Sequence, residues 1–149
     1  MTTSIHFAAI TILSISMNLS LPAMASDDFD GLQDIISKLD FEDKYNGFYV
    51  SQKCAGLYYS VAQYLPKSDV KGITTLAQIA AVFILTANAA LKEKDPNLSD
   101  ESRSKQVDSM MKATAKKYNS ILEENQVNTG SIFNDWIQKE LSICNSIIE

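Results

Sequence analysis

The arrangement of apolar and polar positions predicts a protein built from helices. After residue 25, no strand-like alternation persists, and apolar residues instead recur three and four positions apart, which is the spacing of one helix face. Pro66 and Pro96 interrupt this pattern, because proline does not fit a helix interior. The pattern predicts one short helix and four long ones, over about 28–39, 43–65, 70–94, 100–125 and 131–148.

Short connections of about four to seven residues favour antiparallel neighbours. We therefore expect an all-α fold, an antiparallel up-down bundle of four long helices plus a short N-terminal helix. The helix over 70–94 contains 20 successive uncharged residues, from Gly72 to Leu91, which is long enough to cross a bilayer. Its threonines and many alanines favour a buried central helix instead, with no stable membrane insertion of the mature chain. A membrane span is the alternative.

The first 25 residues read as a secretory signal peptide. They contain no Asp, Glu, Lys or Arg, have an apolar centre, and end in Ala23-Met24-Ala25, a pattern that signal peptidase cleaves. We predict cleavage after residue 25, which leaves one helical domain over 26–149 in a periplasmic or extracellular location. An uncleaved membrane anchor is the alternative.

The two cysteines are predicted to form a structural disulfide. Cys54 and Cys144 both fall on the apolar stripes of their helices, and two lone cysteines in an exported protein usually pair. Redox chemistry is not expected, because no second cysteine is near either one and Lys53 is expected on a different helix face from Cys54.

Composition excludes several classes of function. The chain has 18 acidic and 13 basic residues, a net charge of −5 and a single arginine, Arg103, which disfavours nucleic-acid binding. Its one histidine, His6, lies in the predicted signal peptide. The mature chain therefore has no Ser-His-Asp triad, no Cys-His pair and no imidazole metal site. We expect no enzyme activity, no metal and no cofactor.

Tyrosine is the one unusual feature of the predicted mature chain. Five of the six tyrosines fall in the helix over 43–65, and some share a stripe with small and amide residues. Tyrosine suits partner surfaces because it combines contact area with a polar tip. We expect a non-enzymatic protein that binds an unidentified protein partner, although tyrosines at the core margin explain the same pattern. The predicted contact residues are Tyr45, Tyr49, Gln52, Gly56 and Tyr59.

A carrier of a small apolar ligand is the alternative function. In this reading Met110, Met111 and the alanine-rich helix over 70–94 line an apolar cavity, because methionine adapts to irregular contents. Ordinary core packing explains these residues as well.

Overall fold

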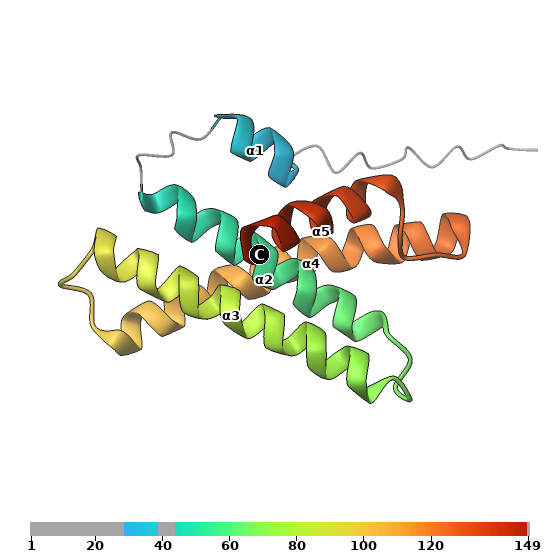
Figure 1. The fold of residues 1–149 in the computed structure, drawn as a ribbon, viewed down its shortest axis with the longest axis horizontal. Helices are drawn as coiled ribbons and strands as arrows, with labels where there is room; N and C mark the ends of the chain where they lie inside the picture. Colours follow the sequence, from blue (N-terminus) through green and yellow to red (C-terminus); the bar gives the residue numbers. More distant parts are fainter. Residues whose placement is uncertain (1–28, 39–43, 149) are drawn as a thin grey trace, which may run out of the picture.

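The computed structural model describes residues 29–38 and 44–148, and all regular structure in these ranges is helical. The signal peptide expected over 1–25 lies outside the described residues. The helices are shown in Figure 1, and their bounds are α1 Leu32–Lys38, α2 Lys44–Tyr64, α3 Val70–Lys94, α4 Asp100–Thr129 and α5 Asp135–Ile148.

Local capping sets where the longer helices begin and end. The Asp69 side chain accepts a hydrogen bond from the Gly72 amide at 2.9 Å and begins α3, while Ser99 accepts one from the Ser102 amide at 3.2 Å and begins α4. Helix α4 continues to Thr129, four residues past its predicted end, until Gly130 adopts a left-handed φ of 75°. Glycine is favoured in that conformation because glycine has no Cβ atom.

Helix α2 occupies the centre of the molecule. It packs against all four other helices, and every residue from Val50 to Val61 except Tyr59 is buried. Figure 1 shows α3 lying beside α2 in the opposite direction, with α4 crossing them. The prediction that the helix over 70–94 is the buried central helix is therefore wrong. In α3 the buried residues are Ala80, Phe83, Ala87 and Leu91, because α2 covers one side of it.

The all-helical class and the disulfide are confirmed, whereas a four-helix up-down bundle is not. No Cα atom of α4 lies within 8 Å of one in α5. These two helices instead meet through side chains, as where the Tyr118 hydroxyl donates to Glu140 Oε2 at 2.7 Å. Four helices in a closed square would bring each backbone against two neighbours along its length.

The Cys54–Cys144 bond joins α5 to the central helix. The two sulfur atoms are 2.10 Å apart, the Cα atoms are 5.6 Å apart, and both cysteines are fully buried. Both residues therefore lie on inward faces, as their positions in the apolar stripes predicted. The bond is consistent with an oxidising, secreted compartment.

Candidate functional site

The predicted tyrosine-rich contact face does not form one open surface. Gln52 is buried, and its side-chain amide donates to the Met110 carbonyl and the Thr114 hydroxyl of α4. Gly56 is also covered by α4, since a Cβ atom placed there would lie 2.8 Å from Thr114 Cγ2. These two residues were predicted to contact a partner. They instead form the α2–α4 interface, because their small size and amide group suit close helix packing.

The tyrosines of α2 have different environments. Tyr59 is 46% exposed and remains available to a partner, while Tyr49 is half-buried. Tyr58 is buried, stacks on Phe83 with ring centroids 5.9 Å apart, and donates to Asn145. The side chain of Tyr45 lies outside the described residues. Most of the described tyrosine surface on α2 therefore serves packing between helices.

An uncharged, solvent-exposed surface is found instead on the outer face of α3. Leu85 is 70% exposed and Val82 is 50% exposed, although both lie in the uncharged stretch that the sequence predicted to be buried. We define the outer face of α3 by its exposed residues between Gly72 and Leu91, which are Thr74, Thr75, Ala77, Gln78, Ala81, Val82, Leu85, Thr86 and Ala89.

The threonines of this face direct their hydroxyl groups to their own helix. Thr74 donates to the Val70 carbonyl at 2.7 Å, Thr75 to the Lys71 carbonyl at 2.9 Å, and Thr86 to the Val82 carbonyl at 3.1 Å. Because these hydroxyl donors are satisfied within the helix, the face is less polar than its composition suggests.

Helix α3 is also, within residues 29–38 and 44–148, the one helix that is long and apolar enough to cross a membrane. A soluble core helix would meet the same criterion, but only 17% of its most apolar segment is buried in the protein. Burial against the described residues therefore does not account for the absence of charge.

Met110 and Met111, the candidate wall residues of an apolar ligand cavity, pack against core side chains. Met111 belongs to the cluster that contains Ala80 and Phe83, and Met110 packs on the cluster of Phe48, Ala87, Leu91 and Val107. The residues that suggested a ligand cavity thus contact the core, as the packing alternative predicted.

A buried polar cluster holds the N-terminal segment against the other helices. Glu140 accepts hydrogen bonds from the Leu32 amide at 2.6 Å and from the Tyr118 hydroxyl at 2.7 Å. The Lys53 ammonium donates to the Asp30 carbonyl and lies 3.9 Å from the centroid of the Phe29 ring. Both charged side chains are almost fully buried.

Burial changes the acidity of this cluster. Desolvation lowers the pKa of Lys53 to about 8, although the nearby Glu140 carboxylate opposes the change. Desolvation likewise raises the pKa of Glu140, against the hydrogen bond from Tyr118. The pKa of the Tyr118 hydroxyl is well above its ordinary value, through burial first and the adjacent carboxylate second.

Sequence reasoning placed Lys53 on a different face from Cys54 and missed Glu140, yet a signal was present for both. Lys53 lies three residues after Val50 and four before Leu57, at the spacing of the apolar stripe. Glu140 has the same relation to Ile137 and Cys144. In both helices, the charged residue that is buried occupies a position where the apolar stripe predicts an apolar residue.

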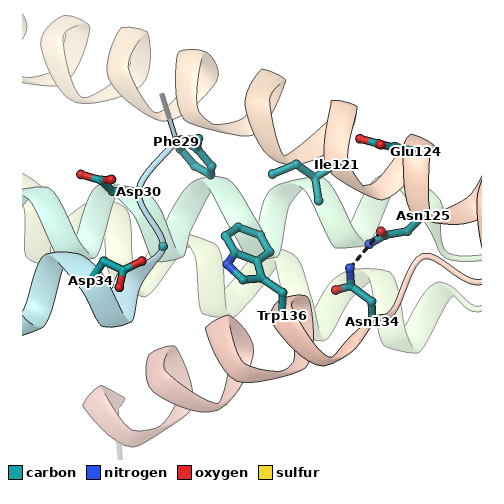
Figure 2. A pocket seen from close by; sticks show the side chains of 9 residues that line it. Phe29, Asp30, Asp34, Ile121, Glu124, Asn125, Asn134 and Trp136 are labelled. Carbon is teal, nitrogen blue, oxygen red and sulfur yellow. Dashed lines mark hydrogen bonds between the residues drawn. The ribbon is translucent and has the colours of Figure 1, made fainter. Parts of the chain in front are cut away.

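A shallow pocket opens beside this cluster, as Figure 2 shows. It has a volume of about 520 Å³ and is formed by the N-terminal segment, the C-terminal half of α4 and the start of α5. The Trp136 indole lies in its middle, and carboxylates lie toward both ends. The described residues hold no group of three or more His, Cys, Asp or Glu side chains that could bind a metal ion.

Comparison of the chain with protein-family models, curated protein sequences and solved structures finds no match.

Proposed function

We propose that this chain is an exported, non-enzymatic protein that acts by binding another protein, and that its partner contacts the outer face of α3. The observation that supports this proposal is a run of 20 uncharged residues on a helix with a solvent-exposed side. At 1.5 Å per residue the run is roughly 30 Å long. Cores of protein interfaces are depleted in charged residues in the same way.

The chemistry of the outer face favours a protein partner over a lipid surface. Helices that lie on membranes combine a Lys- and Arg-rich side with Trp, Phe or Leu on the other. The outer face of α3 contains neither Lys, Arg nor an aromatic residue, and Val82 and Leu85 are its only large apolar residues. The chain also has a net charge of −5, which opposes binding to an anionic membrane.

The small residues of the face suit a partner helix. Ala77, Ala81 and Ala89 allow close approach of a second backbone, and Leu85 between them offers one side chain to anchor the contact. We therefore expect the partner to present a helix whose contacting side is also uncharged. Export would bring the chain to such a partner outside the cytoplasm, consistent with the disulfide.

The proposal is tested by placing a photo-crosslinking amino acid at position 85 and identifying the captured protein from the native extract. The affinity of that purified protein is then measured for wild type, Leu85→Lys and Val127→Lys. Val127 is a matched control because it is also apolar and 78% exposed, but it lies in the last turn of α4.

Leu85→Lys should weaken binding at least about tenfold, because a buried leucine contributes about 1.5–3 kcal/mol and the lysine adds an unpaired charge. Val127→Lys should bind like wild type. Equal affinities for all three proteins, or crosslinks to lipid alone, would refute the proposal.

A further inference from the structure

The pocket around Trp136 has features of a ligand site that the proposed function does not use. Phe29 and Trp136 have ring centroids 6.4 Å apart, and Tyr118 lies 6.0 Å from the Trp136 ring centroid. The indole and Ile121 together give the middle of the pocket an apolar surface (Figure 2).

The amide side chains at one end of the pocket are fixed. Asn134 donates to Asn125 at 2.9 Å and accepts from the Ile137 amide at 2.8 Å. Asn125 in turn donates to the Ile132 carbonyl at 3.2 Å. Since the amide groups of Asn125 and Asn134 are engaged, the carboxylates are the groups left to bind a charged ligand.

Two carboxylates in the pocket form no salt bridge within the described part of the chain. Asp30 pairs with Lys38 at 3.8 Å, whereas Asp34 and Glu124 form no salt bridge with a described residue. The buried Lys53 ammonium attracts Asp34 only at longer range. Figure 2 shows Asp34 at one end of the pocket and Glu124 at the other, with Trp136 between them. Among the described residues, Lys53 and Lys117 lie over the Phe29 ring, whereas no lysine is placed over the Trp136 ring.

From this arrangement we propose that the pocket binds a linear polyamine, with one ammonium group at Asp34, another at Glu124, and the alkyl chain across the Trp136 indole. An ammonium group is attracted to carboxylates by charge and to an indole face by the cation–π interaction. The methylene chain matches the apolar middle of the pocket, which a metal ion does not. A volume of about 520 Å³ is within the range of small-molecule sites.

The fluorescence of Trp136 reports on this pocket directly, because it is the only tryptophan in the chain. The folded mature protein is titrated with spermidine at low salt, and emission is followed. We expect a saturable change. Butylamine, which has one ammonium group, should bind at least about fivefold more weakly, and magnesium chloride at the same concentration should not reproduce the change.

Variants locate the binding. Asp34→Asn and Glu124→Gln should each weaken spermidine binding about two- to fivefold, as expected for partly solvated ion pairs. Glu123→Gln is the matched control, because Glu123 is adjacent and exposed but lies outside the pocket lining. All three positions are exposed, so each variant is expected to fold.

Three results would overturn the proposal. One is the absence of a saturable change up to 10 mM spermidine, on the order of ten times the weakest affinity usual for a metabolite site. Another is equal weakening by Glu123→Gln and Glu124→Gln, which would indicate attraction to the acidic surface as a whole. The third is binding of a tetralysine peptide without binding of spermidine, which would assign the same ammonium chemistry to a basic protein segment.

Discussion

Removal of the disulfide should lower the stability of the protein by a large and calculable amount. The bond joins residues separated by 90 positions, so breaking it restores much of the freedom of a long loop in the unfolded chain. The chain-entropy relation gives about 4.5 kcal/mol for a loop of this length, as an upper figure. Against an ordinary domain stability of about 5–15 kcal/mol, the loss is large.

The double variant Cys54→Ala/Cys144→Ala tests this estimate by urea unfolding followed by circular dichroism. With a urea dependence of about 2 kcal/mol/M, the midpoint should fall by about 2 M. Dithiothreitol provides the control, because it should lower the midpoint of wild type, once unfolding exposes the bond, and leave the double variant unchanged. A double variant that unfolds within about 0.3 M of oxidised wild type would refute the loop-closure reasoning.

Two further predictions concern α2. The pKa of Lys53 is lowered from 10.5 to about 8 in the folded protein. Above pH 8 the unfolded chain therefore binds more protons at this group than the folded chain does. The contribution of Lys53 to the free energy of unfolding should thus rise from pH 8 to about pH 10, where tyrosines begin to ionise. Lys53→Met should remove that rise in urea unfolding measured across this range, and an unchanged pH profile would contradict the burial of a charged Lys53. Gly56→Ala should destabilise the protein by about 1–3 kcal/mol in the same assay, because its Cβ would lie 2.8 Å from Thr114 Cγ2 and 3.1 Å from the backbone nitrogen of Ala115. Gly47→Ala, also in α2 but with nothing within 4 Å, should instead stabilise by about 0.5–1 kcal/mol, and a similar loss at both glycines would contradict the close α2–α4 contact.

The presence of the helices and the pairing of the two cysteines could be predicted, because both predictions use the spacing of apolar residues along the chain. The bounds of α3, Val70–Lys94, agree with the prediction, since Pro66, Asp69 and Pro96 mark them in the sequence. Helix α5 begins at Asp135 rather than at about 131, because the Asn134 side chain caps it by accepting from the Ile137 amide.

Which helix lies at the centre was not predictable from apolar content. Helix α3 has the longer uncharged run, but α2 is surrounded by four helices, although it contains Gln52, Lys53 and Ser60. These polar groups find partners on other elements, as where the Ser60 hydroxyl donates to the Ala115 carbonyl at 2.9 Å. The burial of these polar residues depends on hydrogen-bond partners that are distant in sequence. The pattern of residues within one helix does not reveal those partners.

Two residues of the predicted contact face are covered for the same reason. Gln52 and Gly56 share a helix stripe with Tyr59, but α4 covers only the first two. The exposed side of α3 could not be predicted from hydropathy, because hydropathy depends on composition alone. It does not show which neighbouring helix covers a residue.

The central claim is that a protein covers the outer face of α3 in the native setting, and thiol labelling of Leu85→Cys measures this most directly. The variant of the predicted mature chain, residues 26–149, is labelled with a maleimide as pure protein and again in the soluble native extract, after membranes have been removed. We predict rapid labelling of the pure protein and slow labelling in the extract, whereas Val127→Cys reacts rapidly in both. Equal labelling rates for Leu85→Cys in the two samples would contradict the claim.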